Sequence, residues 1–211
     1  NSGGVSATGV SGSGLAAPFS FKGGSYPGTG GSCGVSLSAS ATCTVVVTFA
    51  PTVVGTPNSQ IDIAYNDGVN AQSTSRAVAG TAVAPANITV SDGPTYDFGT
   101  RANGSSTDKT LTLTNSGGYP ASAMSGSGLS APFTFKGGSY PGTGGTCGAS
   151  LNDAASCTVV LTYAPTATGT HTGTMSVSYN NGASVTSATR ALQGTGAAPA
   201  NITISDGPSY S

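Results

Sequence analysis

Apolar and polar residues alternate along several short stretches of the chain, with a period of two residues. In KTLTLTN the side chains of Leu111 and Leu113 fall on one face and the threonines on the other. The stretch TMSVSY repeats this pattern through Met175, Val177 and Tyr179. Such alternation is typical of a β-strand that covers a core on one side. The chain is therefore predicted to be built from half-buried strands.

A second kind of stretch is more continuously apolar. CTVVLTYAP, which contains Val159, Val160 and Leu161, predicts a central strand whose outer face is covered or carries β-branched residues. Gly, Pro, Asn and Asp separate the stretches, and Asn181-Gly182 favours a hairpin turn. Seven short strands of this kind are typical of a β-sandwich. The expected strands are 87–90, 96–98, 109–114, 133–136, 157–163, 174–179 and 184–193.

The whole pattern occurs twice. The segment APFSFKGGSYPGTGGSCG returns as APFTFKGGSYPGTGGTCG, and Cys33 matches Cys147 at an offset of 147 − 33 = 114 residues. A period of this length corresponds to one sandwich domain. We predict an all-β fold of tandem immunoglobulin-like sandwiches joined by short proline-bearing linkers that favour a semi-rigid rod. The expected domains are an incomplete repeat at 1–84 lacking its first strands, a complete repeat at 85–198, and the first strand of a following repeat at 199–211.

The complete repeat contains, in this order, the motifs YDFG, LTLTNSG, PFTF and TYAPTATG, with Phe98, Gly99, Leu111, Leu113, Asn115, Gly117, Phe133 and the turn at 164–169 as their main residues. This order resembles the ASH or hydin-type domain, which is similar to the major sperm protein fold and to repeats of bacterial choice-of-anchor surface proteins. The resemblance implies an immunoglobulin-like sandwich that serves in assembly or adhesion and brings no catalytic residues with it.

Composition narrows the class of function. Only 6% of residues are charged and the net charge is −1, so nucleic-acid binding is disfavoured. No apolar run approaches the roughly 20 residues that cross a bilayer. Paired cysteines and few charges favour an extracellular or cell-surface location.

Two cysteines recur ten positions apart in each repeat. The even count predicts one disulfide per repeat, Cys33–Cys43 and Cys147–Cys157. Two reduced, buried thiols are the alternative. A zinc site is disfavoured because no nearby Cys or His completes four ligands.

The loop KGGSYPGTGG is identical in both repeats. It makes Lys22, Tyr26, Lys136 and Tyr140 a candidate interaction loop, since exposed aromatic rings often contact proteins or sugars. The alternative is a tight glycine turn preserved by recent duplication. A phosphate-binding loop is excluded, because the Gly-Lys-Ser/Thr ending is missing.

Catalysis is disfavoured, and no catalytic, cofactor or metal residue is expected. The one histidine, His171, corresponds to Pro57 in the other repeat, so a Ser-His-Asp arrangement does not occur in both. The aspartates fall mainly in turns. Asp92 and Asp206 lie near the linkers, but calcium requires several oxygen ligands.

The sequence therefore predicts a non-enzymatic structural repeat of an extracellular fibre or adhesin stalk. The alternative is a module that binds glycan or protein through the Gly/Tyr-rich loops. Expected partners are copies of the chain or adjacent repeats of the same polypeptide, and a surface glycan or protein in the alternative. The incomplete first repeat needs strands from elsewhere, either from the same polypeptide or from a neighbouring chain, for which PANITISDGPSY is one candidate donor.

Overall fold

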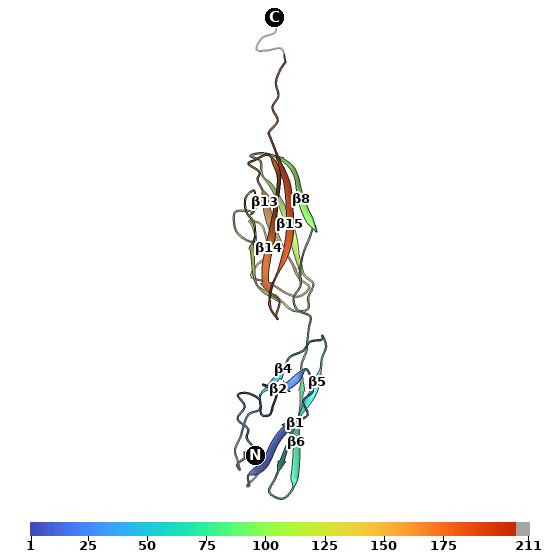
Figure 1. Ribbon diagram of the computed structural model, residues 1–211, viewed down its shortest axis with the longest axis vertical. Coiled ribbons are helices and arrows are strands. Elements are labelled where there is room, and N and C mark those ends of the chain that lie inside the picture. Colours follow the sequence, from blue (N-terminus) through green and yellow to red (C-terminus); the bar gives the residue numbers. More distant parts are fainter. Residues whose placement is uncertain (206–211) are drawn as a thin grey trace. The chain divides into compact units, whose positions relative to one another are not determined.

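The computed structural model describes residues 1–205 and divides into two compact units, unit 1 (Asn1–Val83) and unit 2 (Ala84–Ser211) (Figure 1). Every regular element within residues 1–205 is a β-strand, which confirms the all-β prediction. No helix in this described part is long and apolar enough to cross a membrane. Asp206 and the end of the predicted strand at 199–211 lie outside the described residues.

Unit 2 is a sandwich of two β-sheets whose neighbouring strands are mostly antiparallel. Its strands are β7 (Ile88–Val90), β8 (Thr95–Ala102), β9 (Thr107–Asn115), β10 (Ala121–Ser127), β11 (Phe133–Phe135), β12 (Ser150–Leu151), β13 (Ser156–Tyr163), β14 (Gly169–Asn180) and β15 (Val185–Ala197). One sheet has the order β12-β10-β14-β15-β8 and the other β11-β13-β9-β7. The long strands β14 and β15 pair along their whole length (Figure 1).

The alternating residues of both sheets form the core of unit 2. Leu111 of β9, Val159 of β13 and Met175 of β14 are fully buried, as their period-two spacing predicts. Phe98, Phe133 and Tyr163 form an aromatic cluster with ring centroids 4.9–5.7 Å apart, a geometry that adds to the stabilisation from burial alone. These contacts join the two sheets into one hydrophobic core.

The outward-facing Val160 of the central strand β13 is also buried. Its backbone carbonyl accepts a hydrogen bond from the Lys136 nitrogen (2.9 Å), and its own nitrogen donates to the Pro141 carbonyl (2.8 Å). The Gly/Tyr-rich loop therefore continues the pairing of β13 beyond β11. The position of β13 between β11 and β9, and the burial of Val160, agree with the prediction of a central strand with a covered outer face.

The seven expected strands are present, and β10 and β12 are additional. In β10 the side chains of Ala121 and Met124 are both buried although they lie three residues apart. The register shifts between Ser122 and Ser125, where Ala123 adopts a φ of 52°. This β-bulge breaks the period-two pattern, so alternation does not reveal the strand.

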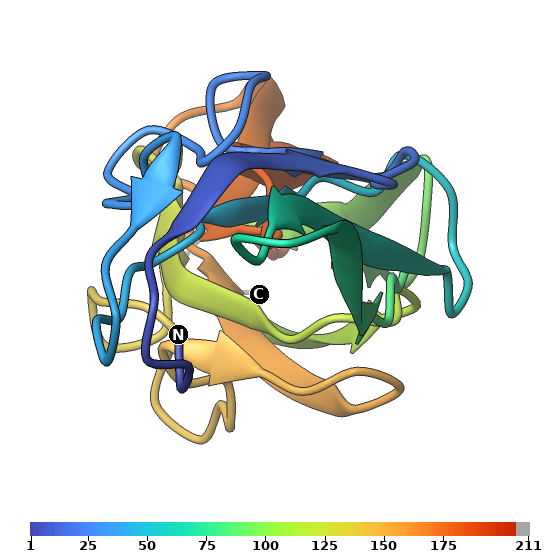
Figure 2. The ribbon, with the colours of Figure 1, turned by 90° about the horizontal axis from the view of Figure 1, so that it is seen from below.

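Unit 1 repeats the second part of this plan, and Figure 2 shows it end-on. Its strands are β1 (Ala7–Ser13), β2 (Phe19–Phe21), β3 (Ser36–Leu37), β4 (Val47–Phe49), β5 (Asn58–Asn66) and β6 (Ala71–Ala79). They form one sheet of order β3-β1-β5-β6 and a two-stranded sheet β2-β4. At the 114-residue offset these six correspond to β10–β15, and within the described residues unit 1 has no counterpart of β7, β8 or β9.

Candidate interaction groove in unit 1

The candidate interaction loop of unit 2 packs its tyrosine against its own domain. The ring of Tyr140 meets Phe135 edge-on at 5.7 Å. A Cβ at Gly126 would lie 2.5 Å from the Tyr140 ring, so the glycine makes room for it. The Tyr140 hydroxyl donates a long hydrogen bond of 3.4 Å to the Gly148 carbonyl, and burial raises the pKa of Tyr140. The ring is therefore half-buried and packs against its own unit.

The loop in unit 1 is built in the same way. Tyr26 meets Phe21 edge-on at 5.7 Å and occupies the space above Gly12. The two lysines differ in their surroundings. Lys136 forms an ion pair of 2.9 Å with Asp108 of β9, whereas Lys22 lies in a unit without a counterpart of that strand. An interaction role for these four residues remains a prediction.

Each unit contains one disulfide, Cys33–Cys43 in unit 1 and Cys147–Cys157 in unit 2. These are the pairs expected from the spacing. Cys157 is the second residue of the central strand β13, and its partner Cys147 lies two residues after the Gly/Tyr-rich loop. In unit 2 the bond therefore ties the end of that loop to β13, whereas in unit 1 Cys43 lies four residues before β4.

The histidine and several of the carboxylates have structural partners. The His171 ring lies 2.9 Å from the buried Tyr163 hydroxyl through Nδ1. Hydrogen bonds from Ser91 and Lys109 hold the pKa of Asp92 below its usual value. Asp97 accepts a hydrogen bond from the Gly99 backbone nitrogen at 2.7 Å. Among residues 1–205 no group of three His, Cys, Asp or Glu side chains is arranged to hold a metal ion.

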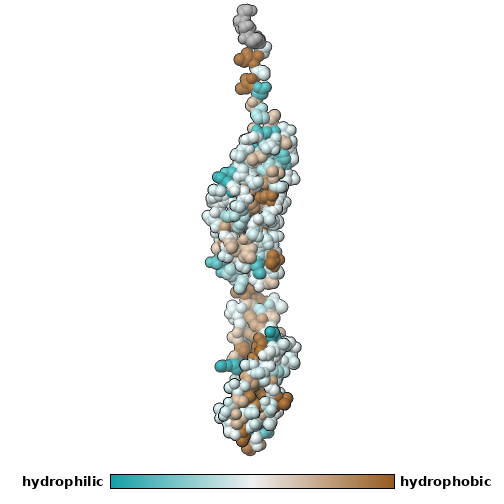
Figure 3. Space-filling model, turned by 90° about the vertical axis from the view of Figure 1, so that its left-hand side faces the viewer, coloured by the Kyte–Doolittle hydropathy of each residue, from teal (hydrophilic) through white to brown (hydrophobic). Residues whose placement is uncertain are grey.

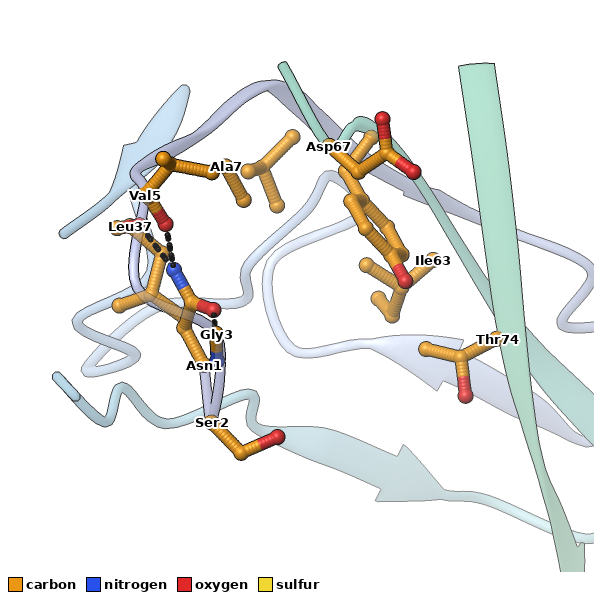
Figure 4. Close-up of a pocket in the computed structure, with 11 residues that line it drawn as sticks. Asn1, Ser2, Gly3, Val5, Ala7, Leu37, Ile63, Asp67 and Thr74 are labelled. Atoms are coloured by element: carbon orange, nitrogen blue, oxygen red, sulfur yellow. Dashed lines mark hydrogen bonds between the residues drawn. The ribbon is translucent and has the colours of Figure 1, made fainter. Parts of the chain in front are cut away.

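Unit 1 has a groove of about 440 Å³ between β1, β3 and β5 (Figure 4). Apolar side chains, among them Ala7, Leu37 and Ile63, surround it. Ile63 and Tyr65 are only half-buried, whereas their counterparts Val177 and Tyr179 are buried in unit 2. The full lining is Asn1, Ser2, Gly3, Val5, Ala7, Val10, Leu37, Ile63, Tyr65, Asp67 and Thr74.

Asn1 fixes one wall of this groove. Its side-chain amide nitrogen donates to the carbonyls of Val5 and Leu37, both at 2.9 Å, and its Oδ1 accepts from the Gly3 nitrogen at 3.0 Å (Figure 4). The equivalent Asn115 makes the same kinds of bond, including one from Gly117 at 3.0 Å. The wall therefore has the same hydrogen-bonded form in both units.

In unit 2 this position is filled by the chain itself. Ala86 and Ile88, which enter the sandwich just before and within β7, are only 4% and 5% exposed. The Ala86 nitrogen donates to the Asn181 carbonyl at 3.0 Å, and the Ile88 nitrogen donates to the Tyr179 hydroxyl at 3.1 Å. The sequence predicts a first repeat that needs strands from elsewhere, but not which residues those strands would cover.

The two facing sheets of unit 2 define an immunoglobulin-like β-sandwich. The chain belongs to the family described as HYDIN/CFA65/VesB-like, Ig-like domain, whose model matches residues 88–195. This match confirms the resemblance to ASH and hydin-type domains. No curated protein matches the chain significantly.

Three solved structures illustrate the similarity. The VesB protease of Vibrio cholerae is 15% identical with a TM-score of 0.42, and the match covers 53% of this chain and 32% of that one. A Porphyromonas gingivalis protein of unknown function is 12% identical, with a TM-score of 0.41 and coverage of 92% and 87%. The human CEP192 ASH/PapD-like domain is 17% identical, with a TM-score of 0.39 and coverage of 56% and 89%. The chain thus spans about a third of the length of VesB.

Proposed function

We propose that this chain is a non-enzymatic structural repeat of an extracellular fibre or adhesin stalk, assembling with copies of itself or with adjacent repeats of the same polypeptide. One observation carries the proposal: two units with the same order of strands, each with one disulfide, follow one another in the chain at an offset of 114 residues. Repetition of one unit along a chain is suited to a shaft or stalk.

The two disulfides support an extracellular location. Such bonds persist in oxidising compartments and stabilise small domains with limited cores. Within residues 1–205 only two ion pairs occur, Lys109–Asp92 and Lys136–Asp108, so surface electrostatics contribute little. Each unit is therefore stabilised mainly by burial of apolar side chains, by strand pairing and by its disulfide, as suits a load-bearing repeat.

The alternative, recognition of a glycan or protein through the Gly/Tyr-rich loops, has less support. The rings of Tyr26 and Tyr140 pack on Phe21 and Phe135 of their own units. An aromatic ring that stacks on a sugar has to present a face to solvent. The loops are therefore better explained as covers for the β4 and β13 edges.

Electron microscopy of the native material tests the structural role. We expect ordered fibres with an axial repeat close to the length of one or two units. Isolated, flexible monomers in the native material would contradict the proposal. Reduction and alkylation of the same sample provides a control. Loss of the disulfides should disorder these units, whereas fibres built from proteins without disulfides should stay intact.

A further inference from the structure

Two strands from opposite ends of the unit 2 sequence, β8 and β15, lie side by side and run in the same direction. The pairing extends from Thr95 to Ala102 in β8 and from Ala191 to Ala197 in β15 (Figure 1). The other strand pairs described between residues 84 and 205 are antiparallel. The parallel pair therefore connects the part of the unit where the chain enters with the part where it leaves.

The chain enters unit 2 near one end of β15 and leaves it at the other. At the entry, the Ala86 nitrogen donates to the Asn181 carbonyl, in the turn that precedes β15. At the exit, the carbonyl of Ala197, the last residue of β15, accepts a hydrogen bond from the Asn103 nitrogen at 2.8 Å. A strand rises about 3.3 Å per residue, so the 13 residues of β15 separate entry and exit by roughly 40 Å.

Tension along the polypeptide therefore acts on the β8–β15 pair as shear. A pull at the entry draws β8 toward the turn at Asn181, and a pull at the exit draws β15 the opposite way. The hydrogen bonds of the ladder run between the strands and not along them, so this pull loads them together. Because forced unfolding is governed by the unfolding rate, a pair loaded in this way resists tension strongly.

The segment before β8 bears the first part of the load. β7 pairs with β9 over three residues, Ile88–Val90. The Arg190 guanidinium of β15 donates to the Val90 carbonyl, and Lys109 forms an ion pair of 3.1 Å with Asp92 in the turn that follows. If β7 detaches, the load passes to β8, which pairs with β15 over six residues. The longer pair is therefore the stronger element.

The side chains of β8 add a second resistance to sliding. Phe98 is 2% exposed and belongs to the core, and Tyr96 meets it edge-on at 5.0 Å. β8 therefore moves along β15 only if the Phe98 ring leaves the core, which exposes apolar surface. The face of unit 2 in Figure 3 is mostly pale, with few strongly hydrophilic residues, so ion pairs contribute little by comparison.

We propose that β8 paired with β15 is a mechanical clamp, which keeps unit 2 folded when tension acts between its entry and its exit. The clamp resists tension through the backbone bonds between the two strands and through the anchoring of Phe98. This inference rests on the proposed function, because a shaft or stalk transmits force along its repeats. It adds to that function the element of the unit that bears the force.

The direction of pulling tests the clamp. Val83→Cys and Ser106→Cys each place one free thiol at an exposed position of a chain whose own four cysteines form disulfides. Each variant is stretched between a handle on that thiol and a handle fused to the C-terminus. Pulling from residue 83 shears β8 against β15, whereas pulling from residue 106 peels the two strands apart from one end.

We expect the unfolding force of unit 2 to be at least about twofold higher in the sheared direction than in the peeled direction. The two variants should unfold at the same urea concentration, which shows that only the direction of pulling differs between them. Equal forces in the two directions, or a higher force on peeling, overturn the proposal.

A single backbone bond tests the end of the clamp. Gly104 has a φ of 85° and the Ser105 nitrogen donates to the Ala102 carbonyl at 3.0 Å, as in a type II turn, which accepts proline at the position of Asn103. Asn103→Pro therefore keeps the turn and removes the bond to the Ala197 carbonyl. Asn103→Ala is the matched control, because it keeps the backbone nitrogen as a donor.

Under constant tension in the sheared direction, Asn103→Pro should unfold about three- to tenfold faster than Asn103→Ala, as loss of one hydrogen bond predicts. Equal unfolding rates for the two variants contradict the clamp.

The outcomes separate this inference from the proposed function. Ordered fibres in the native material, together with equal forces in the two pulling directions, would retain the structural role and reject the clamp. Monomeric native material would reject the structural role itself, even if a single chain resists tension in the sheared direction.

Discussion

The hydroxyl of Tyr179 accepts a hydrogen bond from the backbone nitrogen of Ile88, 91 residues earlier in the chain, at 3.1 Å. Both groups are buried, so the bond replaces water for each of them. It connects β14 to the first strand of the unit and thereby closes one end of the sandwich. Its counterpart in unit 1, Tyr65, lines an open groove.

Removing this hydroxyl should loosen the first strand. Tyr179→Phe leaves the Ile88 nitrogen buried without a partner, which costs about 1–3 kcal/mol. We expect a lower free energy of unfolding for unit 2 in urea and faster hydrogen exchange at Ile88. Tyr65→Phe is the control and should change the stability of the monomeric chain by less than about 0.5 kcal/mol. Equal losses in both variants would contradict this account of the two sites.

Arg190 should contribute more to stability than its counterpart Arg76, just as Tyr179 should contribute more than Tyr65. Arg190 is buried and its guanidinium donates to the Val90 carbonyl. A Cβ on Gly93 would lie 2.8 Å from the Arg190 Cζ, so the turn packs directly on the guanidinium. Arg76 is exposed. We expect Arg190→Met to lower the free energy of unfolding by about 1–2 kcal/mol, because losing the hydrogen bond costs more than is gained by no longer burying a charge. Arg76→Met should have no measurable effect in the same urea titration.

The sequence predicts the strands whose side chains keep a strict alternation. β9 and β14 follow from their period of two, and β13 follows from its run of branched residues. β10 escapes prediction because the bulge at Ala123 places Ala121 and Met124 on one face. Two-residue β12 has too little pattern to be recognised. Local spacing therefore reveals regular strands and misses those shaped by their neighbours.

The groove depends on contacts between residues distant in sequence. The repeated segment PANIT indicates that both copies serve one purpose, but nothing local identifies Tyr179, Asn115 and Gly117 as the groups that receive it. The tyrosines of the Gly/Tyr-rich loops illustrate the opposite case. Their glycine surroundings suggest exposure, whereas Gly12 and Gly126 of the facing strands provide space for the rings.

Each disulfide should contribute measurably to its own unit. Cys147→Ser with Cys157→Ser opens a loop with a sequence separation of 10 residues, and the chain-entropy model gives a loss of about 2–3 kcal/mol. Hydrogen exchange should show the loss in unit 2 and leave unit 1 unchanged. Mass spectrometry supplies a second measurement: alkylation should add no groups before reduction and four afterwards, matching the four cysteines. Alkylation without reductant would indicate thiols.

Acid should weaken unit 2 through Asp108. Hydrogen bonds from Lys136 and Thr162 hold the pKa of this carboxyl below its usual value. A lowered pKa in the folded state stabilises the protein above the unfolded pKa of about 3.9, and the gain is lost as the pH falls through the folded value. Because both side chains of the Lys136–Asp108 pair are at least 40% exposed, screening reduces the effect to roughly 0.2–0.5 kcal/mol.

Asp108→Asn should therefore flatten the dependence of unit 2 stability on pH between 6 and 3, measured by urea unfolding at each pH. Asp153→Asn is the control, because Asp153 forms no ion pair in the described part of the chain. Added salt should shrink the difference between parent and Asp108→Asn near neutral pH. A variant as sensitive to acid as the parent chain would show that other carboxylates dominate.

The tyrosine loops distinguish the structural role from recognition of a glycan or protein. Tyr140→Ala removes a half-buried ring from its contact with Phe135 and should destabilise unit 2 by about 1–3 kcal/mol. Tyr140→Phe keeps the ring and loses only the long bond to Gly148, so stability should be nearly unchanged. If the loop serves packing alone, adhesion and assembly should follow stability, and Tyr26→Phe with Tyr140→Phe should match the parent chain in both assays. If that folded double variant loses adhesion, the hydroxyls contact a ligand and the binding role becomes the better account.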